Sequence, residues 1–197
     1  MYEIVNTSGQ QKKFEKTWEY FCKKFNWVND PYALNGIRYN LLLPGNNRIF
    51  RRRKVIGTIE FIPYDPANPP STVEGRYKFS THKEIQSHQQ KVWEIDKLCI
   101  HETYQRKGNF ESVLHILYDH AMTHYPKYYV ALMEKRLYRM VKFYYGYGVE
   151  KKGEELLGPT SSLVPVIIDV EQITSRQEYL EKLIGKKREG KYYSLPL

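Results

Sequence analysis

The 197-residue sequence contains little cysteine and no long apolar run. Its two cysteines, Cys22 and Cys99, lie too far apart for a metal-binding motif and do not form a disulfide framework. We expect both to be reduced core residues. No segment approaches the roughly 18 consecutive apolar residues of a transmembrane helix. The first residues also lack the apolar stretch of a signal peptide, so we expect a cytoplasmic protein without a membrane span.

The sequence has fewer acidic residues than basic residues. Lys and Arg number 31 against 22 Asp and Glu, which gives a formal net charge of +9. A basic balance favours anionic partners such as nucleic acid, a membrane surface, an acidic protein or a phosphorylated cofactor. A basic, solvated surface without any partner explains the charge equally well. Aromatic residues are plentiful at 15%, which is enough with the aliphatic residues for a substantial core.

Hydrophobic periodicity predicts strands followed by helices along the whole chain. Amphipathic helices are expected over 10–25, 110–124, 135–147 and 171–184. Strands are expected over 2–6, 37–43, 48–52, 55–63, 92–100, 128–133 and 162–170. Gly148 is expected to cap the third helix, and Pro165 suggests that the last strand is an edge strand or is bulged. The segment 65–91 is a long polar connection, which is typical of a functional or mobile loop.

The strand at 92–100 carries two carboxylates among apolar residues. Strict alternation puts Glu94 and Asp96 on one face together with Val92, Leu98 and Ile100. Trp93, Ile95, Lys97 and Cys99 occupy the other face. A carboxylate in apolar surroundings has a raised pKa, which suits a general base. A structural ion pair between Glu94 and Lys97 or Arg139 is the alternative, and Asp96 is the weaker candidate for the base.

A short basic turn that contains a glycine joins this strand to the helix at 110–124. Such a turn directs backbone N–H groups to one point, and the following helix N-terminus adds partial positive charge. Arg106 and Lys107 add full charges, and Gly108 lets the backbone approach a ligand closely. The turn is therefore predicted to cradle a pyrophosphate, although an ordinary basic loop has the same composition.

The turn reads Gln105-Arg106-Lys107-Gly108-Asn109-Phe110 and resembles the Gln/Arg-x-x-Gly-x-Gly/Ala turn of the GNAT (Gcn5-related N-acetyltransferase) superfamily. Gln105 and Gly108 match that pattern, whereas Phe110 stands where the family has Gly or Ala. The preceding strand resembles the family's fourth strand. The segment 137–149 resembles the family's helix that ends in a tyrosine, here Tyr144, and a glycine, here Gly148.

The resemblance implies an α+β, three-layer fold, with a mixed, mostly antiparallel sheet and helices on both faces. It covers 1–170 as one domain, and 171–197 would form a C-terminal helix and basic tail on that domain. The implied activity is direct acyl transfer from acyl-CoA to a small amine acceptor, with acetyl-CoA as the expected donor and no metal. The backbone of Leu98, Cys99 and Ile100 would bind the pantetheine arm, and the turn would bind the pyrophosphate. Glu94 would act as the base, and Tyr144 would protonate the departing thiolate.

A narrower resemblance points to the acyl-homoserine-lactone synthases and long-chain N-acyl amino acid synthases. That branch has a Glu-x-x-Arg pattern on this strand, and here Glu94 is followed by Lys97 in place of the Arg. It also has a Gly-Thr strand that ends near a proline, here Gly57-Thr58 and Pro63. The branch can use acyl carrier protein as the donor, and an acidic carrier would suit a chain of charge +9.

Other interpretations stay open at this stage. Tyr144 could be a packing residue, and Tyr145 or Tyr147 could take the catalytic role. The basic cluster at 51–54 could bind a carrier protein or nucleic acid, or could be a solvated hairpin tip. The whole chain could be a GNAT fold without catalysis, or a basic nucleic-acid-binding module. The sequence does not identify the acceptor, the acyl length or the oligomeric state.

Overall fold

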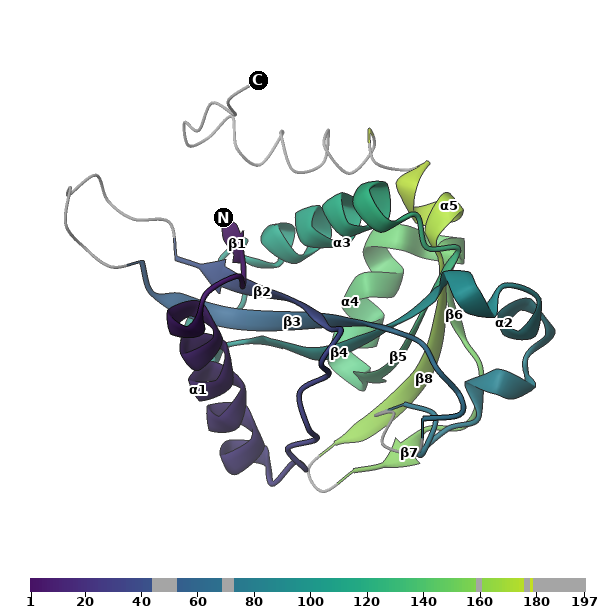
Figure 1. Ribbon diagram of the computed structural model, residues 1–197, viewed down its shortest axis with the longest axis horizontal. Coiled ribbons are helices and arrows are strands. Elements are labelled where there is room, and N and C mark those ends of the chain that lie inside the picture. The colour runs from purple at the N-terminus through teal and green to yellow at the C-terminus, as the bar shows by residue number, and fades with distance from the viewer. Residues whose placement is uncertain (44–52, 69–72, 159–160, 176–177, 179–197) are drawn as a thin grey trace.

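The computed structural model describes residues 1–43, 53–68, 73–158, 161–175 and 178 (Figure 1). Its strands form one sheet in the order β1-β2-β3-β4-β5-β8-β6, and β7 pairs with β8 outside this path. The strands are β1 (Tyr2–Ile4), β2 (Ile37–Leu42), β3 (Val55–Pro63), β4 (Val92–Ile100), β5 (Tyr128–Glu134), β6 (Val149–Lys151), β7 (Leu156–Leu157) and β8 (Ser162–Asp169). Within the described ranges only β4 and β5 pair in parallel, which confirms the mixed, mostly antiparallel sheet.

Helices cover both faces of the sheet (Figure 1). The α-helices are α1 (Ser8–Phe25), α2 (Lys83–Ser87), α3 (Phe110–His124), α4 (Lys135–Tyr145) and α5 (Val170–Thr174). α1 packs on β2, β3 and β4 on one face. On the other face α3 packs on β2, α4 packs on β5, β6 and β8, and α5 contacts α3 and β8. The chain is therefore a three-layer α+β protein. None of the described helices combines the length and the apolar character that crossing a bilayer requires.

α1 is defined by its cap and by one apolar face. Thr7 and Gln10 form a capping box, in which the Gln10 backbone N–H donates to Thr7 Oγ1 and the Thr7 N–H donates to Gln10 Oε1. Phe14, Trp18 and Phe21 recur at helical spacing and are buried against the sheet. The helix ends at Phe25 because Asn26 takes a left-handed conformation, with φ 52°.

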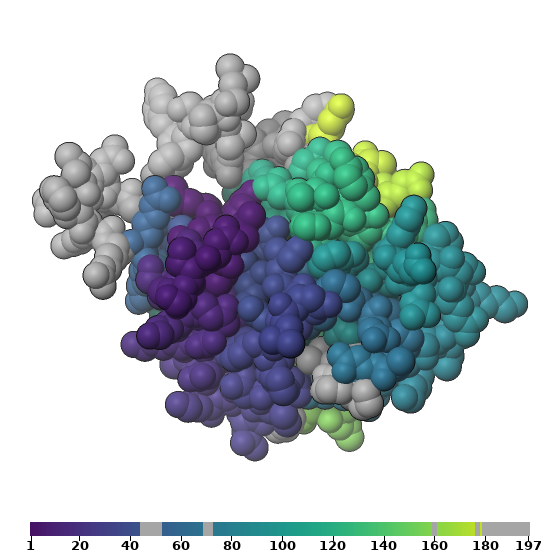
Figure 2. Space-filling view, in the orientation of Figure 1, coloured from purple at the N-terminus to yellow at the C-terminus, as the bar shows by residue number. Residues whose placement is uncertain are grey.

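The connection between β3 and β4 contains short helical elements. It contains the 3₁₀ turns η1 (Phe79–Thr81) and η2 (Gln89–Lys91) on either side of α2. Val73, Phe79 and Ile85 of this connection pack with Val130 and Ile167 of the sheet. It therefore covers the face that α1 covers, but farther along, over β5 and β8. Figure 2 shows this face, with α1 in purple and the connection in blue to teal.

β4 does not keep the strict alternation that its sequence predicts. Lys97 has a left-handed backbone, with φ 48°, and the register with β3 shifts there. This bulge puts Lys97 on the same face as Asp96, with which it forms an ion pair. Leu98 and Ile100 therefore pack in the core with Trp93 and Ile95, and the prediction that they share a face with Glu94 is wrong. Cys99 packs under α1 instead.

Three further expectations about the elements need correction. The helix predicted over 135–147 ends at Tyr145, where Gly146 is the cap. Gly148 lies in η4 (Gly146–Gly148), where a Cβ would press on Ile173. Pro165 is interior to β8, and its carbonyl accepts a hydrogen bond from Lys152 N at 3.0 Å. Proline has no backbone N–H, and at this position the N–H would point between β6 and β7. The sheet therefore loses no hydrogen bond between strands.

Two short strands were not predicted, and some predictions cannot be compared. β6 and β7 have three and two residues, which is too short for a periodic signal. The strand expected at 48–52 lies outside the described residues. The helix expected over 171–184 is described as α5 up to Thr174, and most of its remainder and the basic tail lie outside the described ranges.

Candidate functional site

β4 and β5 separate soon after they pair. Their parallel register covers three residue pairs, from Val92 opposite Tyr128 to Glu94 opposite Val130. Beyond that point β5 continues to Glu134 on β8, and β4 continues to Ile100 on β3. The edge of β4 that follows Glu94 has no strand neighbour on its β5 side within the described residues. The carboxyl ends of the two central strands therefore diverge and leave a gap.

A cavity of about 520 Å³ occupies this gap. β4 contributes Ile95–Leu98 and β5 contributes 131–134, and Leu137 of α4 closes the end. The other walls come from α1, the segment after it, the β3–β4 connection and the segment around β7. The lining residues of these four segments are Trp18, Trp27, Val28, Asp30, Val73, Arg76, Leu156, Leu157, Gly158, Ser161 and Leu163. The lining is mainly aliphatic and aromatic, so the cavity suits a ligand with a substantial apolar part.

Two ion pairs interrupt the apolar lining. Arg76 Nη2 lies 2.9 Å from Asp30 Oδ2 at one wall. Lys97 Nζ lies 2.6 Å from Asp96 Oδ2 at the floor. Burial raises the pKa of Asp30, and the Arg76 guanidinium partly offsets that effect. The cavity therefore presents carboxylates from two different segments of the chain to a bound molecule.

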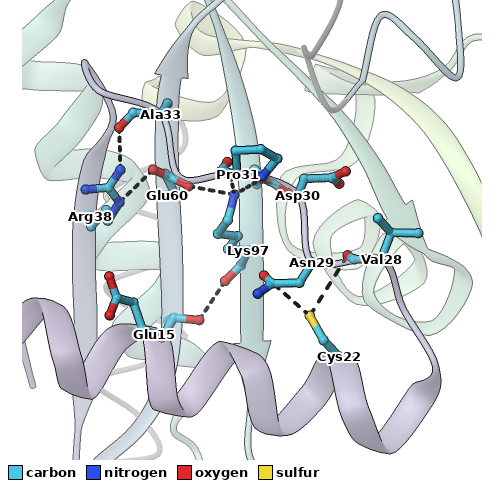
Figure 3. A network of polar contacts seen from close by, with 12 residues as sticks. Glu15, Cys22, Val28, Asn29, Asp30, Pro31, Ala33, Arg38, Glu60 and Lys97 are labelled. Carbon is cyan, nitrogen blue, oxygen red and sulfur yellow. Dashed lines mark hydrogen bonds and ion pairs between the residues drawn. The ribbon is translucent and has the colours of Figure 1, made fainter.

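Lys97 is the centre of a buried ionic network (Figure 3). Its side chain has no exposed surface, and its ammonium lies 2.9 Å from Glu60 Oε2 and 3.4 Å from the Pro31 carbonyl oxygen. Glu60 in turn lies 2.7 Å from Arg38 Nε. Burial lowers the pKa of Lys97, but the carboxylates of Asp96 and Glu60 outweigh it and hold the pKa above its ordinary value.

The network connects the cavity wall to three strands. Arg38 lies on β2, Glu60 on β3 and Lys97 on β4, and Arg38 also donates to the Ala33 carbonyl. Pro31 and Ala33 belong to the segment after α1, which supplies Trp27, Val28 and Asp30 to the cavity. The charges of the network therefore hold this wall in place. The sequence does not predict the ion pair between Lys97 and Glu60, because Glu60 lies 37 positions upstream and on another strand.

The basic turn after β4 leaves a run of backbone N–H groups open. Arg106 and Gly108 have positive φ angles of 59° and 79°. Side-chain amides stabilise the turn, since Gln105 Nε2 donates to the Ile100 carbonyl at 2.7 Å and Asn109 Nδ2 donates to the Tyr104 carbonyl at 2.8 Å. Within the described chain, the N–H groups of residues 106–110 make no hydrogen bond of good geometry to another backbone group. These groups and the α3 N-terminus can bind an anion.

Phe110 and Tyr144 bring the turn and α4 together. Phe110 is buried, and its ring centroid lies 5.7 Å from that of Tyr144. The neighbouring tyrosines differ: Tyr145 is in the core, where burial raises its pKa, and Tyr147 is exposed. Of the three tyrosines in this stretch, Tyr144 is the one that is half-buried beside the turn.

The structure gathers some of the predicted site residues and separates others. Leu98 lines the cavity, and the turn at 105–110 follows the end of β4 after the 3₁₀ turn η3 (Glu102–Tyr104). Glu94 is buried within the segment that pairs with β5 and does not line the cavity, whereas Asp96 does. Cys99 Sγ lies 3.1 Å from Thr58 Oγ1, and burial raises the pKa of this thiol to about 12. A thiol with such a pKa is a poor nucleophile at neutral pH.

Sequence reasoning did not find most of the cavity wall. Trp18, Trp27, Arg76 and Leu157 come from segments far apart in the chain and form no local motif. One feature of the sequence did point to the cavity, namely the pair of carboxylates on an apolar strand. One of the two, Asp96, lies at the floor of the cavity.

The fold of the chain is similar to that of several solved structures. No protein family matches the chain in sequence, and no curated protein matches it. FeeM, an N-acyl amino acid synthase from uncultured soil microbes, matches its structure with a TM-score of 0.60 at 11% identity, over 89% of this chain and 94% of FeeM. The acyl-homoserine-lactone synthase LasI gives 0.63 at 11% identity, over 91% and 94%. A Lactobacillus plantarum protein assigned as an N-acetyltransferase gives 0.57 at 10% identity, over 86% and 97%. The chain therefore has a GNAT-like fold that resembles the N-acyl amino acid synthase and acyl-homoserine-lactone synthase branch.

Proposed function

We propose that this protein is an acyltransferase that moves an acyl group from a thioester donor to an amine by direct transfer. The observation that carries the proposal is the divergence of β4 and β5 after Glu94 and Val130. It leaves an unpaired strand edge beside a cavity, and that edge leads to a turn with open N–H groups. A donor with a long polar arm and an anionic end fits this series of features.

The donor would lie along the end of β4. Its pantetheine amides would pair with the free edge of the strand at Leu98–Ile100, as an added strand does. Its pyrophosphate would bind the N–H groups of residues 106–110, with Arg106 and Lys107 close by. A backbone N–H near Leu98 would polarise the thioester carbonyl. Acyl-CoA supplies all of these groups.

The cavity favours an acyl chain longer than acetyl. Ligand pockets of about 300–1,000 Å³ hold molecules of drug size, and this cavity measures about 520 Å³. An acetyl group would fill little of that apolar space, and the acceptor would have to fill the rest. The long-chain alternative from the sequence therefore has the better structural support, and acetyl-CoA is the competing donor.

The acceptor amine would enter the cavity from the side of α1. Asp96 is the β4 carboxylate that lines the cavity, so it would orient the ammonium group. Glu94, buried in the paired segment, would receive the proton through a relay such as a bound water. Tyr144 would protonate the departing sulfur from its place beside Phe110.

Isothermal titration with CoA, acetyl-CoA and a long-chain acyl-CoA tests the proposal. We expect saturable binding that is tightest for the long-chain thioester. Gly108→Asp should abolish this binding for two reasons. The backbone at this position has a φ of 79°, which strains a residue other than glycine. The aspartate would also place a negative charge in the proposed anion site. Gly9→Asp is the matched control, since a Cβ on Gly9 meets no atom within 4 Å. Circular dichroism should show that both variants are folded.

Turnover assays then separate the remaining possibilities. Release of free thiol with an amine acceptor supports acyl transfer. Tight binding without turnover of any thioester would support the non-catalytic alternative. Failure of all three ligands to bind would contradict the CoA site.

A further inference from the structure

One polar group on the wall of the cavity has no partner. Trp18 is the residue of α1 that lines the cavity, and it is only 8% exposed. Its indole Nε1–H makes no hydrogen bond within the described part of the chain. An indole N–H can only donate, and a buried donor without an acceptor destabilises the native state. A molecule bound in the cavity can supply the missing acceptor.

Packing fixes the indole ring of Trp18 in the wall. The ring belongs to a cluster with Phe21 and Cys22 of α1 and with Cys99 of β4. Its centroid also lies 5.8 Å from that of Trp27, in the segment after α1. A ring packed on several sides cannot turn to another acceptor without losing these contacts. The N–H is therefore held in place for a ligand.

The cations of the cavity, in contrast, are already paired. Arg76 pairs with Asp30, and Lys97 is shared by Asp96 and Glu60 (Figure 3). Among the described residues that line the cavity, these two cations stand against three carboxylates. A carboxylate on a ligand would have to displace a protein carboxylate from its cation, which leaves a buried charge unpaired.

The groups that a ligand can still reach favour two different polar groups on it. The side chain of Asp96 is 18% exposed, whereas that of Lys97 has no exposed surface. The floor of the cavity therefore offers a carboxylate, which attracts an ammonium group. The wall offers the neutral N–H of Trp18, which suits an uncharged oxygen.

We propose that Trp18 determines the specificity for the acceptor, and that the acceptor is an amine with an uncharged oxygen group, such as an amino alcohol or an amino acid amide. The inference rests on the proposed acyl transfer. Asp96 would hold the ammonium group, and Trp18 Nε1–H would donate to the hydroxyl or carbonyl oxygen. A free amino acid would be a poorer acceptor, because its carboxylate would meet no free cation among the described lining residues.

The test measures turnover of one long-chain acyl-CoA with four amines that share an isobutyl side chain: leucinol, leucinamide, leucine and isoamylamine. Isoamylamine lacks the oxygen. Trp18→Phe keeps an aromatic ring and removes the N–H. We expect it to lower kcat/KM about tenfold for leucinol and leucinamide, and less than about twofold for isoamylamine. Trp93→Phe makes the same change in a tryptophan outside the cavity lining and should lower none of these values.

Two results would overturn the inference. One is an equal loss of kcat/KM with all four amines, because Trp18 would then act on the donor or on folding. The other is a lower KM for leucine than for leucinol and leucinamide in the native protein. This second comparison needs no variant, so it decides the question even if Trp18→Phe does not fold.

Isothermal titration of leucinol into the protein separates this inference from the proposed function. Binding that Trp18→Phe weakens, without turnover of any thioester, would keep the acceptor site and reject acyl transfer. Turnover of all four amines with the same kcat/KM in the native protein and in Trp18→Phe would keep acyl transfer and reject the inference.

Discussion

Phe110, the first residue of α3, packs its ring against Tyr144 of α4, with 5.7 Å between the ring centroids. The family turn that this segment resembles has Gly or Ala at that position. The larger side chain is buried in the hydrophobic core, whereas residues 106–108 of the turn are exposed. The departure from the family pattern therefore affects the packing of the core and does not cover these three residues.

The burial of Phe110 gives a stability prediction. Phe110→Ala should lower the free energy of unfolding by about 3 kcal/mol, because it leaves a cavity where the ring was. Urea denaturation followed by circular dichroism measures this change. Phe143→Ala, on the exposed side of α4, is the control and should stay within about 0.5 kcal/mol. A loss below 1 kcal/mol for Phe110→Ala would show that the ring adds little to the core.

Lys97 should be essential to the stability of the cavity floor. Lys97→Met leaves the carboxylates of Glu60 and Asp96 without their shared cation, so we expect a loss of about 3–5 kcal/mol. The double variant Lys97→Met with Asp96→Asn also removes the carboxylate whose ion pair is with Lys97, and it should recover part of that loss. Chemical denaturation of both variants is the measurement. Equal stability of the single variant and the native protein would mean that the network contributes nothing.

His120 should make stability depend on pH. It has no exposed surface, its ring stacks on Phe61 at 3.9 Å, and burial lowers its pKa from 6.5 to about 3. Between these values the unfolded chain binds a proton that the native protein does not. The free energy of unfolding should therefore fall as the pH falls through this window, by up to about 1.4 kcal/mol per unit. Above pH 6.5 this effect is absent.

Denaturation curves between pH 4 and pH 7 test the His120 effect. His120→Gln should flatten the slope, because glutamine does not titrate and still offers a polar atom to Tyr129. His88→Gln is the control on an exposed histidine and should leave the slope unchanged. A slope that is the same in all three proteins would assign the pH dependence to other groups.

Both cysteines should be unreactive in the native protein. Burial raises the pKa of Cys22 to about 11 and that of Cys99 to about 12. Iodoacetamide at pH 8 should therefore leave the folded chain unmodified, since the thiolate is the reactive form. In denaturant two additions should appear by mass spectrometry. Modification of Cys99 without denaturant would indicate that α1 lifts from β4.

Much of the fold could be predicted because its elements are locally encoded. The bounds of β3, β4 and α3 agree with those read from periodicity, since each has a clear apolar pattern and a turn at its ends. The bulge at Lys97 could not be predicted, because lysine has no special preference for a left-handed backbone. It reversed the faces assigned to Leu98 and Ile100. Pro165 was misread because its position between β6 and β7 depends on strands too short to detect.

The candidate site likewise has one part that the sequence predicts and another that it does not. The turn at 105–110 is continuous in sequence, so its open N–H groups could be anticipated from a strand, a glycine and a helix. The residues that line the cavity are discontinuous in sequence, because its walls combine α1, the β3–β4 connection and β7. Only tertiary packing brings Trp18, Arg76 and Leu157 together. The choice between Glu94 and Asp96 likewise depends on which carboxylate lines a space that the sequence does not display.

The short pairing of β4 with β5 has a consequence for how the protein unfolds. Three residue pairs form the seam between β1–β4 and β5–β8, so the sheet consists of two halves with few shared backbone bonds. A pantetheine arm along β4 would act as a surrogate strand and lengthen that seam. The free protein should then exchange the gap-facing amides of β5 early, and the liganded protein should protect them. Ligand binding would in this sense extend the backbone pairing between two halves of the sheet that already share one hydrophobic core.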